Sequence, residues 1–233
     1  MSVMTPHRNH YPEGAEPDEE AFLRALSDLG EALRDSSLRV LVMGGVGSAS
    51  LARPRPTDDI DLFVHPEDAD ALLLHLAEHG FDVEETNPTW IYKAWRHGVL
   101  VDVIFKSTGD IYVDEAMLQR SLVRTFKGVE LRTIPPEDLI VVKAVASAEH
   151  VPHHWYDALG VIARCDLDWT YLVERSRRFG PRRVLSLLLY AESLDLAVPA
   201  AAIDRLFEVV HPTLSPDAGS RSDVAAPGRP AQR

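Results

Sequence analysis

The sequence predicts an α/β fold, in which a mixed β-sheet with flanking helices is followed by a small helical domain. Two observations predict it. Up to about residue 134, segments with helical spacing alternate with short apolar segments bounded by Gly or Pro. From residue 135 onward, only helical patterns follow one another. We therefore expect one domain over residues 19–134 and a second over residues 135–211.

The first domain opens with an amphipathic helix over residues 21–34, where Leu and Phe recur at helical spacing. A buried strand over residues 38–43 then ends on Gly44-Gly45, which predicts a tight turn into a short helix over residues 46–51. The further elements expected in this domain are a strand over 59–64, a helix over 67–79 that stops at Gly80, and strands over 81–85, 90–95 and 99–105.

The second domain is expected to hold only helices. Pro135-Pro136 opens the first of them, because proline is favoured at the start of a helix. Residues 1–18 and 212–233 combine Pro, Gly, Ser and charged residues without periodicity, so we expect a disordered lead-in and a disordered tail. The helices expected between them cover residues 135–148, 155–163, 168–178, 182–194 and 199–210.

Composition limits the classes of protein that this chain can represent. The 233 residues include a single cysteine, Cys165, which excludes an internal disulfide and fits a cytoplasmic location. No apolar run is long enough for a membrane span, and the polar, acidic N-terminus is not a signal peptide. The formal charge of −12 argues against broad, non-specific binding of nucleic acid.

Three aspartates form the most informative pattern. Asp59 and Asp61 alternate along a strand, so both project from one face, while Ile60 and Leu62 pack on the other. Asp102 stands in the most apolar strand of the chain, where a carboxylate without a partner is costly. If the two strands are neighbours, the three aspartates form a ligand set for Mg²⁺, which prefers hard oxygen ligands. Asp102 is also a candidate base for an attacking hydroxyl.

Gly44 and Gly45 supply a second half of this predicted site. Glycines that follow a strand let the backbone approach phosphates, and amides at the start of the next helix bind them. Ser48 would add a hydroxyl. Each feature has an ordinary alternative, since acids alternate on surface strands and glycine pairs form turns. Their occurrence together, in this order, favours a metal–triphosphate site.

The pattern of Gly44-Gly45, thirteen further residues and Asp59-Ile60-Asp61-Leu62 resembles the signature of the DNA polymerase β-like nucleotidyltransferase superfamily. The preceding Arg55-Pro56-Thr57 is similar to the branch of AbiEii-type toxins and minimal nucleotidyltransferases. The resemblance implies a nucleotidyltransferase fold and two Mg²⁺ ions on Asp59, Asp61 and Asp102 when NTP is bound. It also implies contacts of Gly44, Gly45 and Ser48 with the triphosphate.

The same branch implies a nucleotide contact for Lys143 and for Asp157. Lys143 is one of four lysines and stands in an otherwise apolar helix; the alternative is a side chain that reaches solvent at the helix edge. Asp157 has the alternative of a structural pair with an arginine. The Arg-Asp-x-x-Asp pattern of the branch is replaced here by residues 153–157.

Three other features have two interpretations each. The histidines at 150, 153 and 154 suggest zinc, but we expect a solvated loop, because no cysteine accompanies them and adjacent histidines point apart. The alternative for them is a role near the active site. The arginines from Arg175 to Arg183 form either a solvated, pair-forming face or a phosphate-binding patch for RNA. Trp90 is expected to be a core or domain-contact residue, with the border of a base as the alternative.

The function expected from these patterns is Mg²⁺-dependent transfer of NMP from an NTP to an acceptor hydroxyl. The acceptor stays open among tRNA, a protein side chain and a small molecule such as an antibiotic. A toxin-like role with an antitoxin partner is a further expectation of the resemblance. The alternative is a nucleotide-sensing or partner-binding protein that keeps this fold without turnover.

Overall fold

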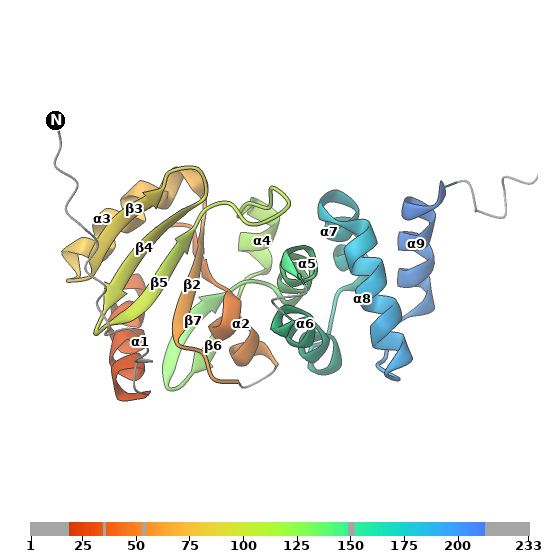
Figure 1. Ribbon diagram of the computed structural model, residues 1–233, viewed down its shortest axis with the longest axis horizontal. Coiled ribbons are helices and arrows are strands. Elements are labelled where there is room, and N and C mark those ends of the chain that lie inside the picture. The colour runs from red at the N-terminus through yellow and green to blue at the C-terminus, as the bar shows by residue number, and fades with distance from the viewer. Residues whose placement is uncertain (1–18, 35, 53–54, 149–151, 213–233) are drawn as a thin grey trace, which may run out of the picture.

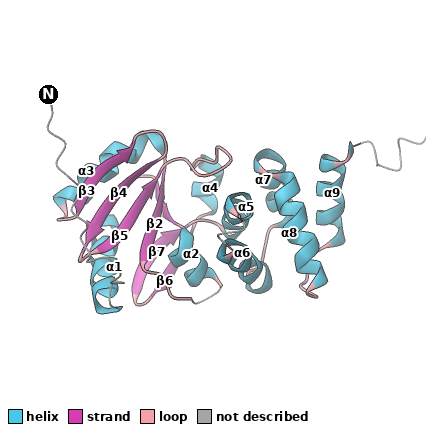
Figure 2. Ribbon diagram, viewed as in Figure 1, coloured by secondary structure: helices cyan, strands magenta, loops and turns pink. Residues whose placement is uncertain are grey.

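In the part of the chain that the computed structural model describes (residues 19–34, 36–52, 55–148 and 152–212), seven strands form one mixed sheet. Its strand order is β3-β4-β5-β2-β1-β7-β6 (Figure 1, Figure 2). The strands are β1 (Val40–Val42), β2 (Asp59–Val64), β3 (Asp82–Asn87), β4 (Ile91–Arg96), β5 (Val99–Ile104), β6 (Leu122–Phe126) and β7 (Val129–Thr133).

The helices of this sheet domain connect its strands. In α3, Gly80 provides the left-handed stop with φ of 82°, as the sequence predicted. The helices and the one 3₁₀ turn are α1 (Glu19–Arg34), α2 (Gly44–Leu51), η1 (Pro66–Asp68), α3 (Ala69–Glu78) and α4 (Glu115–Arg120).

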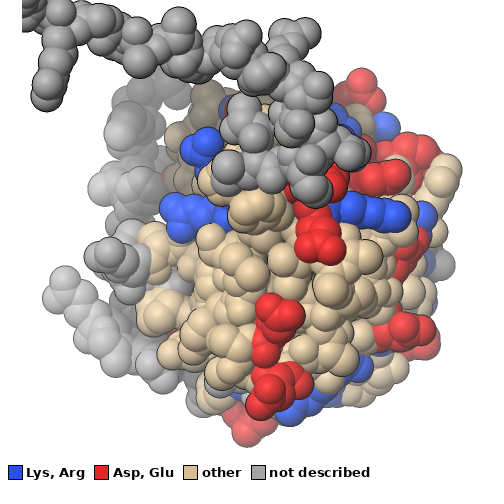
Figure 3. Space-filling view, turned by 90° about the vertical axis from the view of Figure 1, so that its right-hand side faces the viewer, with Lys and Arg blue, Asp and Glu red and all other residues tan. Residues whose placement is uncertain are grey.

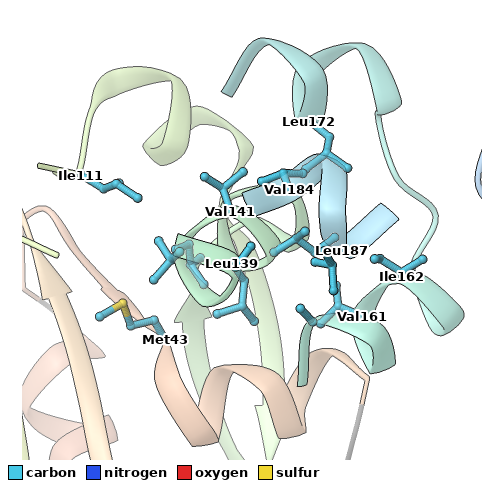
Figure 4. Close-up of a cluster of buried hydrophobic side chains, with 14 of the residues drawn as sticks. Met43, Ile111, Leu139, Val141, Val161, Ile162, Leu172, Val184 and Leu187 are labelled. Carbon is cyan, nitrogen blue, oxygen red and sulfur yellow. The ribbon is translucent and has the colours of Figure 1, made fainter. Parts of the chain in front are cut away.

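Alternation along the strands divides the hydrophobic core between the two faces of the sheet. Ile60, Leu62 and Val103 face α1 and α3 and belong to one buried cluster. Phe63 and Ile104 face the other way and belong to a second cluster. This cluster continues into the C-terminal helices, where Leu139, Val161 and Leu187 lie together (Figure 4). Asp59 and Asp61 project from the same face of β2 as Phe63, so both side chains point toward the C-terminal helices.

The C-terminal helices stack beyond that face, with α9 farthest from the sheet (Figure 1). The hydrophobic cluster runs without interruption from Phe63 of the sheet to Leu206 of α9. The end of the molecule near α9 shows a broad uncharged surface without a continuous basic patch (Figure 3). These helices are α5 (Pro136–Ala146), α6 (His153–Arg164), α7 (Trp169–Phe179), α8 (Pro181–Ser193) and α9 (Ala200–Val210).

The predicted α/β class is confirmed, as are the five C-terminal helices. The β6–β7 hairpin and α4 were not predicted. The hairpin turns at Lys127-Gly128, whose φ angles of 47° and 85° are both positive, as a two-residue turn between twisted strands requires. Its strands are largely exposed, so hydrophobic alternation gave little signal. β7 nevertheless extends the sheet by pairing parallel to β1.

The predicted lead-in and tail lie outside the described residues, apart from Pro212 at the start of the tail. The division into two domains at residue 134 stays a prediction. Among the helices of the described residues, none is long and apolar enough to cross a membrane.

Candidate active site

The acidic strands lie side by side, as the sequence analysis expected. β2 pairs parallel to β5, and Asp61 is the Cα partner of Asp102 in that ladder. Asp59 lies two residues before Asp61 on the same face of β2, since Ile60 between them is fully buried on the other face. The tertiary structure thus brings the three aspartates to one region of one face.

The glycine pair fits directly against the first two aspartates. Gly44 has φ of 61°, and a Cβ atom at this position would overlap the carboxylate of Asp61. A Cβ atom on Gly45 would overlap the hydroxyl of Thr57, which itself donates to Asp59 Oδ1 at 3.0 Å. The Gly45 amide donates to the Asp61 carboxylate. Two glycines are therefore needed here because the acidic strand packs on the backbone of the turn.

Asp102 is held differently from Asp59 and Asp61. Its Oδ1 accepts a hydrogen bond from Lys93 Nζ at 2.7 Å, and Lys93 is its Cα partner on β4. Within the described ranges, no three His, Cys, Asp or Glu side chains gather as a metal site. The structure therefore does not preassemble the predicted ligand set of three aspartates, and the metal role of Asp102 stays a prediction.

A cavity of about 260 Å³ lies beside Asp59 and Asp61, between the sheet and the C-terminal helices. It brings together acidic, basic and aromatic side chains and the glycine turn, with residues from β2, α2, α5 and α6. Asp102, Ser48 and Asp157 are not among its lining residues. Those lining residues include Gly44, Gly45, Arg55, Asp59, Asp61, Trp90, Lys106, Lys143, His153 and His154.

The crowding of carboxylates changes the acidity of Asp61. Burial, followed by the charges of Asp59 and Asp102, raises the pKa of Asp61 to about 7, against the opposing charge of Lys143. Burial also raises the pKa of Asp102, against the hydrogen bond and charge of Lys93. The protein alone therefore places too little positive charge near Asp61 to stabilise its ionised form.

Lys143 and Asp157 form a buried pair behind the cavity. Lys143 Nζ lies 3.1 Å from Asp157 Oδ2, and the Lys143 and Asp157 side chains are 5% and 0% exposed. Arg55 Nε lies 3.1 Å from Asp157 Oδ1. Although burial opposes it, the hydrogen bonds and charges of Arg55 and Lys143 lower the pKa of Asp157. The structural pair with an arginine is thus present, while Lys143 is buried and does not reach solvent at a helix edge.

Ser48 does not project into the cavity. Its side chain is buried, and its hydroxyl donates to the carbonyl of Gly44 at 2.7 Å, one turn back in α2. The predicted contact with the triphosphate stays a prediction, but the structure already gives the hydroxyl a partner inside the helix.

The expectation about the histidines was wrong. His153 and His154 begin α6 and line the cavity, with ring centroids 4.7 Å apart, so they neither lie in a solvated loop nor point apart. Burial, with the charges of Lys143 and His153, lowers the pKa of His154 to about 4. Trp90 is 44% exposed, so it is not a core residue, and it lines the cavity between the sheet and the C-terminal helices. Its role as a domain contact or at the border of a base stays a prediction. His150 lies outside the described residues.

Arg175 does not belong to an exposed arginine patch over residues 175–183, which was one of the two interpretations of this segment. Arg175 is buried and pairs with Asp138 of α5 and with Asp114, which precedes α4. Arg178 is 67% exposed. Arg175 therefore joins the helical domain to the sheet domain and is not available to bind phosphate.

The fold of this chain is similar to solved structures of low sequence identity. An antigenic nucleotidyltransferase-like protein from Paracoccidioides brasiliensis is 17% identical, with a TM-score of 0.49, 82% of this chain covered and 95% of the other. The antibiotic-resistance factor ANT(2'')-Ia is 16% identical, with a TM-score of 0.48 and coverages of 76% and 95%. Identities and TM-scores this low assign neither substrate nor mechanism. No curated protein sequence matches this chain.

The model of a protein family gives the decisive comparison. It is described as "Uncharacterised nucleotidyltransferase" and matches residues 11–194, which contain all the residues of the cavity. This match agrees with the resemblance to the DNA polymerase β-like superfamily. The chain belongs to this nucleotidyltransferase family.

Proposed function

We propose that this protein transfers NMP from an NTP to an acceptor hydroxyl with the help of Mg²⁺, held by Asp59 and Asp61. One observation carries the proposal: both aspartates line a cavity that is also bounded by the glycine turn and by three basic side chains. These are Arg55, Lys106 and Lys143. The cavity thus offers carboxylates to a metal and positive charge to the phosphates.

The donor set fits a hard divalent cation. Asp59 and Asp61 supply carboxylate oxygens on one face of β2, and Mg²⁺ commonly takes one or two carboxylates together with substrate phosphates. Burial near other carboxylates raises the pKa of Asp61 to about 7, which marks a place where a cation stabilises the ionised form. When bound, the ion would neutralise charge on the reacting phosphates.

The turn at Gly44-Gly45 would hold the triphosphate. It forms the start of α2, whose first residues have no side-chain cap, and the positive end of a helix dipole favours a phosphate there. Lys143 faces the same cavity from α5 and adds a charge that Asp157 fixes in place. We extend the nucleotide role to Lys143 on this ground, and to Asp157 only as the residue that positions it.

The acceptor supplies the hydroxyl that attacks the α-phosphate. Since Arg175 is used inside the fold, the basic surface expected for an RNA acceptor is reduced to the arginines at 177, 178, 182 and 183. A small molecule or a protein hydroxyl remains compatible with the net charge of −12. The toxin-like role and its antitoxin partner stay predictions of the sequence resemblance.

Titration calorimetry with each of the four NTPs, with and without Mg²⁺, tests the proposal. We expect Mg²⁺-dependent binding that Asp59→Asn/Asp61→Asn loses and that Asp204→Asn, on the exposed face of α9, retains. Turnover would then be followed as pyrophosphate release with candidate acceptors. No binding of any NTP by the folded protein would overturn the proposal and favour the partner-binding alternative.

A further inference from the structure

Three charged side chains lie in one row across three neighbouring strands. Asp61 of β2 is the Cα partner of Asp102 of β5, and Asp102 is the Cα partner of Lys93 of β4. Partners in a ladder project from the same face of a sheet, so all three side chains lie on the face turned toward the C-terminal helices. The row thus contains two carboxylates and one ammonium group.

The two carboxylates of this row have different neighbours. Asp61 lies against Gly44, which follows β1, whereas Asp102 pairs with Lys93 of β4 at 2.7 Å. In the strand order, β1 and β4 stand on opposite sides of the β2–β5 pair. Within the described residues the three aspartates are not gathered as a metal site, and Asp61 lines the cavity while Asp102 does not.

The ion pair of Lys93 and Asp102 is partly shielded from water. The side chains of Lys93 and Asp102 are 29% and 17% exposed. A cation that took Asp102 as a ligand would have to displace the ammonium group, or to lie beside it with like charge. The two lysines that line the cavity already have partners, since Lys143 pairs with Asp157 and Lys106 pairs with Asp110.

Resting on the function proposed above, we propose that the site takes a single divalent cation, between Asp59 and Asp61, and that the Lys93 ammonium group stands at Asp102 in place of a second one. Lys93 is then a positioning residue: it fixes the Asp102 carboxylate and determines the number of metal ions. This differs from the two ions that the sequence resemblance implies.

Electron paramagnetic resonance of the full chain with Mn²⁺ and a non-hydrolysable analogue of the best-bound NTP tests this. Two Mn²⁺ ions in one site, about 3.5–4 Å apart, would couple magnetically, whereas a single ion would not. We expect one uncoupled ion in the wild type and a coupled pair in Lys93→Met. Lys93→Arg, which keeps the charge, should stay at one ion. Lys93→Met/Asp102→Asn should return to one, because the freed carboxylate is gone.

A coupled pair in the wild type would overturn the inference and leave the proposed function intact. An uncoupled ion in folded Lys93→Met would overturn the role of Lys93; Lys93→Gln replaces this variant if circular dichroism shows that it does not fold. No Mn²⁺ binding that depends on the analogue, in any of these proteins, would overturn the proposed function itself.

Discussion

Arg55 and Asp157 are 102 positions apart in the sequence, yet Arg55 Nε donates to Asp157 Oδ1 at 3.1 Å. This contact joins the segment that leads into the acidic strand to helix α6. Because Asp157 also holds Lys143, a single carboxylate sets the position of two of the three basic side chains at the cavity.

The first prediction concerns this carboxylate. In Asp157→Asn, the buried ammonium group of Lys143 loses its ionised partner, so we expect unfolding free energy to fall by about 3–5 kcal/mol. Urea unfolding at neutral pH measures it. Glu20→Gln is the control, because the pair of Glu20 with Arg24 is exposed and should change stability by less than about 1 kcal/mol. Equal losses in the two variants would contradict the prediction.

The second prediction concerns pH. The pKa of Asp61 is raised to about 7 by burial, so a proton competes with the cation below that pH. We expect Mg²⁺-dependent NTP affinity to rise with pH up to about 7 and then to level off, in calorimetric titrations from pH 5.5 to 8.5. Affinity that does not vary across this range would show that Asp61 is already ionised at pH 5.5.

The free energy of unfolding of the metal-free protein should change with pH in the opposite direction to NTP affinity: the contribution of Asp61 falls as pH rises. The folded pKa of Asp61 lies above its unfolded value of 3.8, so the folded state binds the proton more tightly. This contribution to stability is present at low pH and is lost as pH rises toward 7. Asp61→Asn should therefore stabilise the metal-free protein at pH 8 by more than about 1 kcal/mol, and much less at pH 4. Thermal unfolding at the two pH values would reveal the difference.

A matched pair of glycines gives the fourth prediction. Gly44 and Gly128 have φ angles of 61° and 85°, so alanine at either position costs about 1 kcal/mol of backbone strain. A Cβ atom at Gly44 also overlaps Asp61, whereas one at Gly128 meets nothing within 4 Å. We expect Gly44→Ala to abolish Mg²⁺-dependent NTP binding and Gly128→Ala to leave it unchanged. Binding that survives in Gly44→Ala would remove the turn from the site.

The fifth prediction concerns Arg175 of α7, which pairs with Asp138 of α5 and with Asp114 before α4. In Arg175→Met, the carboxylate of Asp138 keeps only its hydrogen bond from the Tyr171 hydroxyl, and Asp114 loses its buried partner. We expect a loss of about 3–5 kcal/mol in unfolding free energy. Arg178→Met, at a side chain that is 67% exposed, should cost less than about 1 kcal/mol in the same urea titration. A small loss in Arg175→Met would mean that this network does not stabilise the fold.

Features that depend on local periodicity could be predicted from the order of the amino acids alone. Alternation placed Asp59 and Asp61 on one face of a strand, and helical spacing located the C-terminal helices. Both signals are local, because a side chain's direction follows from the backbone of its own element. The β6–β7 hairpin was not predicted, because its exposed strands show little alternation of apolar and polar residues.

Which charged side chains pair with one another depends on how distant segments pack. The neighbours of β5 and β6 in the sheet, the pair of Asp102 with Lys93 and the pair of Asp157 with Arg55 depend on strand order and on how α6 packs. No local sequence pattern determines these neighbours. Ion pairs between distant segments form only where the packing of the apolar faces brings two charged side chains together. The sequence therefore identified the acidic residues, while the fold decided that Asp61 faces the cavity and Asp102 faces Lys93.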